Sequence, residues 1–167
     1  MTAYHCTVDT PLGPFSAVVD ADGAVLASGW TPHADTLVPL IHPTLRPAAL
    51  DVRSDLGDVT RAITAYHAGD LAAIDPIPVT QHSGPFLETA WEVLRKVPAG
   101  EPITYTEFAS LSGRPAAIRG AASACARNAA ALFVPCHRVL RVGGALGGFR
   151  WGLPVKRWLL SHEDSAR

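Results

Sequence analysis

The chain has 167 residues, 48% of them hydrophobic and 17% charged, a composition that supports a packed core and argues against intrinsic disorder. Its three cysteines include no Cys-x-x-Cys pair, which argues against a disulfide framework and a thiolate zinc site and favours a reducing compartment. We find neither a signal peptide nor an apolar run long enough to span a membrane, so we predict a soluble cytoplasmic protein.

Acidic and basic residues are separated along the chain, although the net charge is only −1. Residues 1–80 carry nine aspartates and three arginines, a charge of −6, whereas residues 81–167 carry six acidic and eleven basic residues, a charge of +5. Nine of those eleven bases are arginine, whose planar guanidinium suits phosphate. The separation favours a polyanionic partner for one half, and an ordinary solvated surface explains the charges alone equally well.

The first half of the chain has the pattern of a small antiparallel sheet. Alternating apolar residues predict strands over 4–8 and 15–19. Asp22-Gly23 predicts a tight hairpin turn into a third strand over 24–30.

A proline-rich loop is expected next, over residues 31–53, and a helix follows it. Ser54 is the expected N-cap of this helix, and Gly69 is its expected stop. Its buried face is predicted to carry Val59, Ile63 and Tyr66. The first domain is therefore predicted to span residues 1–80.

The second half, residues 81–167, is predicted to be a mostly helical domain. Pro85 opens one helix, and Thr104 with Glu107 has the spacing of a capping box that starts another. Pro115 is expected at the first position of the next helix, giving a helix-turn-helix, and Pro154 opens the last helix. The fold class is therefore α+β.

The helix expected after Pro115 is unusually thin, because alanine and glycine dominate residues 116–124. Arg119 projects from its middle. A thin helix can approach another backbone closely, and a tightly packed core helix is the alternative interpretation.

Cys136 and His137 lie side by side within Pro135-Cys136-His137-Arg138-Val139, directly after an apolar run. Proline ends that run, so the thiol is expected at a rigid turn. A thiol held beside an imidazole is what nucleophilic sulfur chemistry requires. A buried structural cysteine is the commoner role of this residue type and remains the alternative.

Several motifs in the second half have a common order and spacing. They are Thr104-Tyr105, the run from Arg119 to Asn128, the Pro135 to Val139 motif, Gly147-Gly148-Phe149-Arg150-Trp151-Gly152, and the run from Trp158 to Glu163. Together they resemble the O6-alkylguanine-DNA alkyltransferases, in the form found in the C-terminal domain of bacterial Ada and in Ogt proteins. The similarity is strong over residues 85–163 and weak over residues 4–70. It implies a ribonuclease H-like first domain and a winged-helix-like second domain.

The resemblance implies a DNA repair reaction in which Cys136 irreversibly accepts the alkyl group from O6 of guanine, once per protein molecule. O4-alkylthymine is left open as a second substrate. The resemblance also implies that His137 takes the thiol proton through a water and that Glu163 orients the imidazole, an arrangement of nucleophile, base and orienting acid.

Two further residues complete the expected catalytic set. Tyr105, together with the backbone amide near Arg150, is expected to stabilise the charge that develops on the leaving guanine. Asn128 is expected to fix the turn before the active site by bonding backbone groups.

The resemblance also implies base flipping in the minor groove, with Arg119 entering the base stack. The other expected DNA contacts are Thr104, Tyr105, Thr106, Arg114, Ala117, Gly120, Ser123 and Arg127. The expected substrate pocket is formed by Val139, Phe149, Arg150 and Trp151. The expected partner is double-stranded DNA containing O6-alkylguanine, bound by a monomer, with no cofactor, no metal and no membrane.

Two departures from the family pattern affect these expectations. Ala129 stands where many members have proline, which predicts a less rigid hinge after Asn128. Trp151 is bulky where some members have small residues, which predicts weak reaction with free benzylguanine. Cys125 is expected to serve helix packing, and Cys6 to be a strand residue.

Three other functions fit part of the sequence. An inactive damage-binding relative would lack the thiol that Cys136 supplies. A cysteine hydrolase would use Cys136 and His137 but would leave Arg119 and the thin helix unexplained. A helix-turn-helix regulator would need long polar side chains for reading the major groove, and this helix has few.

Overall fold

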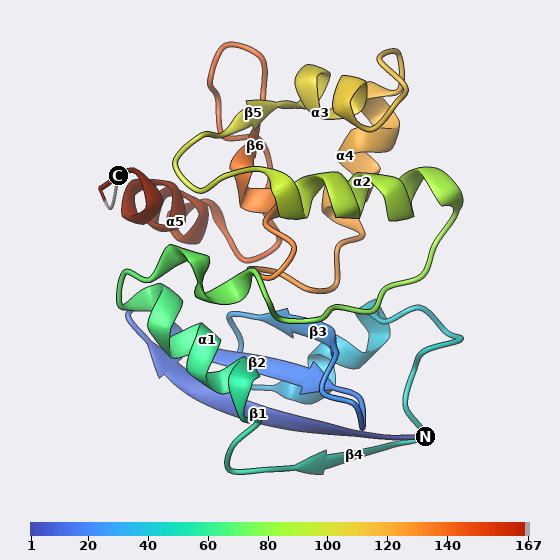
Figure 1. The fold of residues 1–167 in the computed structure, drawn as a ribbon, viewed down its shortest axis with the longest axis vertical. Coiled ribbons are helices and arrows are strands. Elements are labelled where there is room, and N and C mark those ends of the chain that lie inside the picture. The colour runs from blue at the N-terminus through green and yellow to red at the C-terminus, as the bar shows by residue number, and fades with distance from the viewer. Residues whose placement is uncertain (166–167) are drawn as a thin grey trace. The chain divides into compact units, whose positions relative to one another are not determined.

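The computed structural model describes residues 1–165, and Figure 1 shows their helices and strands. The chain divides into two compact units. The first consists of Met1–His82 with Ala129–Phe133, and the second of Ser83–Asn128 with the chain from Val134 onward. Sheet and helices occur together, so the predicted α+β class is confirmed.

The first unit is built on a four-stranded sheet with the order β3-β2-β1-β4 (Figure 1). The strands β1 (Thr2–Thr10), β2 (Gly13–Val19) and β3 (Val25–Gly29) are antiparallel neighbours, as the alternating pattern predicted. Asp20 accepts hydrogen bonds from the backbone of the Asp22-Gly23 turn, which confirms the hairpin.

The fourth strand, β4 (Ala49–Val52), runs parallel to β1 and lies at the edge of the sheet. It corrects the expectation of a loop over 31–53, which also contains the 3-10 helix η1 (Ala34–Leu40). This strand is short and mostly exposed, so it lacks the alternation that reveals a half-buried strand. Its pairing with β1, distant in the sequence, makes it a strand.

Helix α1 (Asp58–His67) packs against β1. It begins after Gly57, and Ser54 is not its cap; the Asp55 carboxylate accepts the Gly57 N–H at 2.7 Å instead. Gly69 follows the helix with a φ of 115°, which confirms the predicted stop. The buried face includes, as predicted, Val59, Ile63 and Tyr66.

The segment Ala129–Phe133 is hydrogen bonded to β3, far away in the sequence. The Ser28 N–H donates to the Ala129 carbonyl at 2.9 Å, and the Ser28 hydroxyl donates to the Ala131 carbonyl at 2.7 Å. The whole segment is buried, and Leu132 has a left-handed φ of 78°, uncommon for a side chain of this size. The sheet of the first unit therefore fixes the chain just before the Pro135 motif.

Three helices come first along the chain in the second unit. Helix α2 (Pro85–Lys96) starts at the predicted proline, and α3 (Tyr105–Leu111) starts with the predicted capping box of Thr104 and Glu107. Helix α4 (Ile118–Ala126) begins three residues later than expected. Pro115 lies in a turn that the Ala117 N–H closes on the Arg114 carbonyl at 2.9 Å.

A pair of short strands and a last helix also belong to the second unit. The short strand β5 (Ile103–Thr104) pairs in parallel with β6 (Val139–Leu140), which joins the start of α3 to the chain just after Cys136. The last helix is α5 (Leu153–Ser165). Within residues 1–165, no helix combines the length and the apolar character that crossing a bilayer requires.

Candidate active site

The structure places Cys136 at the start of a single 3-10 turn, η3 (Cys136–Arg138). Pro135 precedes this turn with a φ of −81°, and the Cys136 N–H bonds to the Val134 carbonyl at 2.8 Å. Residue 136 is only 9% exposed. The thiol is therefore held by backbone geometry at the edge of a buried region.

The surroundings of the Cys136 thiol have opposing effects on its ionisation. Burial raises the pKa of the thiol, because a thiolate is poorly solvated in the interior. A hydrogen bond from the Asn128 amide and the positive charges of Lys156 and Arg150 work in the opposite direction. Because burial prevails, the thiol needs a base to become a nucleophile at neutral pH.

His137 is a suitable base. Its Nε2 lies 2.8 Å from the Glu163 Oε2, and because a carboxylate only accepts, Nε2 carries the proton. Burial lowers the pKa of the imidazole more than Glu163 raises it, so the ring is neutral. Its Nδ1 is buried and has no hydrogen-bond partner among residues 1–165. The lone pair of Nδ1 is therefore available to accept a proton.

Glu163 on α5 is held ionised in the interior by two partners. Burial alone would raise the pKa of the carboxyl, but His137 and Arg138 outweigh it and lower the pKa well below its usual range. Arg138 Nη2 donates to Glu163 Oε2 at 2.8 Å, and Arg138 Nη1 donates to the Val97 carbonyl at 2.8 Å. The motif arginine, to which sequence reasoning gave no role, is thus the buried counter-charge of Glu163.

Lys156 on α5 is a second functional candidate that sequence reasoning missed. It is fully buried, and its Nζ donates to the Val139 carbonyl at 2.9 Å and also to the Leu146 carbonyl. Its charge favours the Cys136 thiolate. A lysine in an amphipathic helix is usually on its solvated face, so only the tertiary structure shows this one to be buried.

Tyr105 on α3 lies near the thiol. Burial, together with the nearby Cys125 and Cys136, raises its pKa to about 12, so its hydroxyl stays protonated and can donate a hydrogen bond. The hydroxyl is hydrogen bonded to Cys125. Its oxygen would lie 3.5 Å from a Cβ atom added at Gly147. Burial raises the pKa of Cys125 as well, so that thiol is a weak nucleophile.

Asn128 links the end of α4 to the active-site turn. Its Nδ2 donates to the Val134 carbonyl at 2.7 Å, and its side chain also bonds to Cys136. Its backbone carbonyl accepts a hydrogen bond from Arg150 at 3.0 Å. The asparagine side chain thus bonds the Val134 carbonyl and Cys136 on the far side of the turn.

The expected DNA contacts are distributed over the α3–α4 hairpin and its connections. Exposed positions among them are Thr106, Arg114, Arg119 and Arg127, and the partly buried ones are Thr104, Tyr105, Ala117, Gly120 and Ser123. The Arg114 guanidinium lies 5.6 Å from the Phe86 ring centroid. The hairpin therefore carries three exposed arginines.

Packing against α2 explains why position 120 is a glycine, and sequence reasoning did not find this. A Cβ at this position would lie 2.9 Å from Cε2 of Phe86 on α2, closer than side chains tolerate. The Trp91 ring N–H donates to the Ala124 carbonyl at 2.9 Å, so α2 and α4 are closely packed. Part of the thinness of α4 is thus explained by its contact with α2.

The expected pocket residues differ in their surroundings. Phe149 and Trp151 are partly buried, and Arg150 is exposed. The Val139 side chain is fully buried in the second unit. Among residues 1–165, no group of three His, Cys, Asp or Glu side chains is arranged to hold a metal ion.

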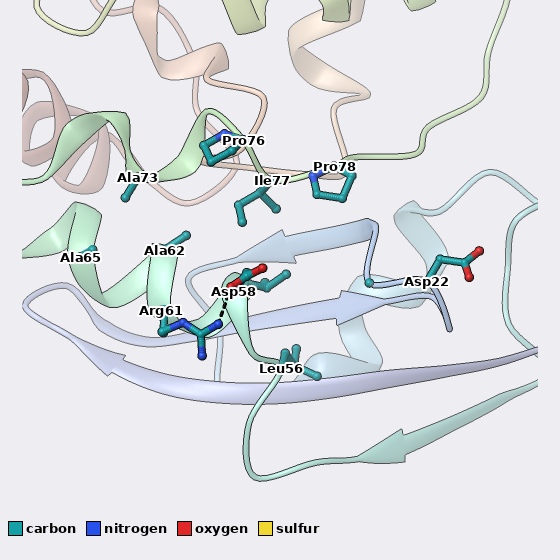
Figure 2. A pocket seen from close by; sticks show the side chains of 12 residues that line it. Asp22, Leu56, Asp58, Arg61, Ala62, Ala65, Ala73, Pro76, Ile77 and Pro78 are labelled. Atoms are coloured by element: carbon teal, nitrogen blue, oxygen red, sulfur yellow. Dashed lines mark hydrogen bonds and ion pairs between the residues drawn. The ribbon is translucent and has the colours of Figure 1, made fainter.

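A cavity of about 400 Å³ lies in the first unit, between α1, the turn after β2 and the 3-10 helix η2 (Leu71–Ile74) (Figure 2). Its lining is apolar apart from Asp22 and the ion pair of Asp58 with Arg61. The described lining residues include no thiol, imidazole or hydroxyl group.

Comparisons with known proteins agree with this geometry. The family described as "6-O-methylguanine DNA methyltransferase, DNA binding domain" matches residues 85–165. A methylated-DNA–protein-cysteine methyltransferase of Shigella flexneri is 32% identical over 158 residues, covering 93% of this chain and 92% of the relative. The crystal structure of Mycobacterium tuberculosis OGT in complex with DNA has a TM-score of 0.80 and 26% identity, covering 98% of this chain and 94% of that one.

The chain belongs to the methylated-DNA–protein-cysteine methyltransferase family. The Ada protein of Escherichia coli K12, described as a bifunctional transcriptional activator and DNA repair enzyme, is 42% identical over 120 residues, covering 70% of this chain and 33% of Ada. The family resemblance inferred from the motifs is therefore confirmed.

Proposed function

We propose that the protein repairs double-stranded DNA by transferring the alkyl group of O6-alkylguanine to Cys136 in a single, irreversible turnover. The observation that carries the proposal is the buried set of Cys136, His137 and Glu163, in which Glu163 fixes the imidazole so that Nδ1 is left as the base. Membership of the methyltransferase family supports the same reaction.

The reaction balances without a cofactor. His137 Nδ1 is proposed to accept the thiol proton through a water, and the Cys136 thiolate attacks the alkyl carbon. The new sulfur–carbon bond forms as the bond between that carbon and O6 breaks, and the electron pair stays on the guanine. The thiolate is a poor leaving group from a neutral thioether, so Cys136 keeps the alkyl group and the protein acts once.

The departing guanine needs a hydrogen-bond donor, because charge develops on the base as the bond breaks. Tyr105 is the proposed donor, since its pKa of about 12 keeps the hydroxyl protonated over the whole physiological range. The backbone amide near Arg150 is proposed as a second donor, and Phe149 and Trp151 as walls of the pocket.

The target atom is inaccessible within a stacked duplex, so the nucleotide must be flipped out. Arg119 is exposed in the first turn of α4 and is proposed to fill the gap in the stack. The remaining contacts are proposed to be to phosphates and sugar, which makes binding largely independent of sequence. They are Thr104, Tyr105, Thr106, Arg114, Ala117, Gly120, Ser123 and Arg127.

Finer expectations belong to the same proposal. We propose that the protein acts as a monomer in the cytoplasm, associated with the nucleoid when it repairs DNA, and without metal or cofactor. We also retain residues 1–80 and 81–167 as the two functional domains, with residues 81–167 binding the DNA.

One experiment separates the repair function from hydrolysis and from binding alone. The protein is incubated with duplex DNA containing O6-methylguanine, digested, and the peptide with Cys136 is weighed. We expect one added methyl group, in an amount equal to the repaired base and never exceeding the protein. Multiple turnovers would favour a hydrolase, and an unmodified peptide would favour a binding protein. The Cys136→Ser variant is the matched control and should carry no methyl group.

A further inference from the structure

The loop of residues 141–152, which carries the proposed pocket residues, is rich in glycine. Gly143, Gly144 and Gly147 all have positive φ values between 73° and 93°, a backbone conformation that glycine adopts without a steric penalty. Such a loop does not hold its shape by backbone preference alone. Hydrogen bonds within the loop, such as that from the Arg141 N–H to the Ala145 carbonyl at 2.8 Å, and contacts with the rest of the second unit fix its conformation.

Two cations from different positions fasten this loop. Near its middle, the buried Lys156 Nζ donates to the Leu146 carbonyl. Near its end, the Arg150 guanidinium donates through Nη1 to the Asn128 carbonyl at 3.0 Å and through Nη2 to the Ala126 carbonyl. The loop is thus fixed to α5 by Lys156 and to the C-terminal end of α4 by Arg150.

One of the two carbonyls that Arg150 binds, that of Ala126, is a terminal helix carbonyl with no partner inside the helix, and the other lies just beyond the helix end. Ala126 is the last residue of α4, and Asn128 follows directly after the C-cap. Carbonyls at a helix C-terminus carry partial negative charge and are satisfied by cationic side chains. A planar guanidinium can donate to two carbonyls at once, whereas a lysine has no such fixed fork.

Asn128 connects this helix end to the nucleophile. Its side chain donates to the Val134 carbonyl at 2.7 Å and bonds to Cys136, while its own carbonyl is bound by Arg150. The chain of contacts runs from the pocket loop through Arg150 and Asn128 to the thiol. All of these residues belong to the second unit.

We propose that Arg150 is a positioning residue, whose guanidinium fork ties the glycine-rich pocket loop to the C-terminal end of α4 and so holds the Asn128 amide against Cys136. This role rests on the proposed alkyl transfer to Cys136. It is distinct from the expected roles of position 150, which were a place in the substrate pocket and a backbone amide near the leaving guanine.

Other groups near Cys136 also affect its ionisation and must be held constant. The titratable and charged groups that interact with it come from α3, α4, α5 and the pocket loop: Tyr105, Cys125, Lys156 and Arg150. Arg150 is the exposed cation among them, so its charge is screened by salt, whereas its hydrogen-bond fork is not.

Three substitutions separate the fork from the charge. Arg150→Lys keeps the charge and loses the fork, Arg150→Gln loses the charge and keeps a short amide, and Arg150→Ala loses both. The matched control is Arg157→Gln, which removes the charge of an exposed arginine on α5. Urea unfolding of each variant shows that any change in rate belongs to folded protein.

The first measurement is the rate of methyl transfer from duplex DNA containing O6-methylguanine. We expect Arg150→Lys, Arg150→Gln and Arg150→Ala each to slow transfer by about tenfold, the effect of losing hydrogen bonds to a charged group. Arg157→Gln should react at the wild-type rate. A wild-type rate for Arg150→Lys would overturn the proposal, because the fork would then be unnecessary.

The second measurement is the pH dependence with which iodoacetamide alkylates Cys136, followed by mass spectrometry of its peptide. We expect its midpoint to rise in all three variants, because each loosens the Asn128 hydrogen bond to the thiolate. An unchanged midpoint in all three would contradict the proposal. The iodoacetamide measurement needs no DNA. If the wild-type protein accepted no methyl group from DNA, the proposed function would be refuted, but the iodoacetamide measurement would still test the role of Arg150.

Discussion

Two regions of the second unit place their charges in opposite environments. Glu163, His137 and Arg138 are buried and bonded to one another, whereas the arginines of the α3–α4 hairpin, Arg114, Arg119 and Arg127, are exposed. Burying charge is costly and is tolerated only where each charge has its partners. The buried charges are therefore satisfied by one another, whereas the exposed arginines keep their charges at the surface.

The largest effect should come from breaking the buried set. Glu163→Gln leaves Arg138 buried without its counter-charge, so we expect the free energy of unfolding to fall by about 3–5 kcal/mol. Urea unfolding measures this loss, and methyl transfer by the remaining folded protein should be severely reduced. Asp164→Asn, an exposed neighbour on α5, is the control and should change stability by less than about 0.5 kcal/mol. Similar stability of the two variants would mean that the buried ion pair is unimportant.

The exposed set should affect binding without affecting stability. Arg119→Ala should slow repair of duplex DNA by about 10- to 100-fold, because the stacking it supplies to the gap is worth about 1–3 kcal/mol. Reaction with free O6-methylguanine base should change little, since nothing has to be flipped. Single-turnover rates on the two substrates measure the difference, with Arg157→Ala as control. Equal losses on duplex and free base would remove the flipping role.

Gly120 tests whether the thin helix is shaped by packing or by DNA. Gly120→Ala places a Cβ against the Phe86 ring. Overpacking should lower the free energy of unfolding, and the better helix propensity of alanine should offset part of that, so we expect a net loss of about 1 kcal/mol. Adding Phe86→Leu should recover that loss. Affinity for duplex DNA is measured in parallel. If the double variant regains stability but not DNA affinity, Gly120 also contacts DNA.

Part of the pH dependence of stability should come from the buried set. The folded-state pKa of Glu163 is lowered, so its contribution to stability is present above the unfolded value of about 4.3 and is lost as the pH falls below it. The pKa of His137 is also lowered, so the unfolded chain binds its proton first, below about pH 6.5. Both effects make the free energy of unfolding fall on acidification from pH 7 to pH 4. The fall should be smaller in Glu163→Gln, and an equal fall in the two proteins would contradict this account.

Local features could be predicted from the sequence because they depend on neighbouring residues. The capping box of Thr104 and Glu107, the helix start at Pro85 and the turn at Asp22-Gly23 all form as predicted. The Pro135 motif likewise sets the thiol at a turn, since proline and the residues beside it suffice to end the preceding run.

Long-range features were decided only by the tertiary structure. β4 is a strand because β1 pairs with it, and Ala129–Phe133 is fixed because Ser28 bonds to it. Arg138 and Lys156 gained their roles from partners that lie 25 and 17 residues away along the chain. Residue type and spacing determine which groups are available for chemistry, whereas the solvation and partners of a charge depend on packing between distant segments, which no local pattern encodes.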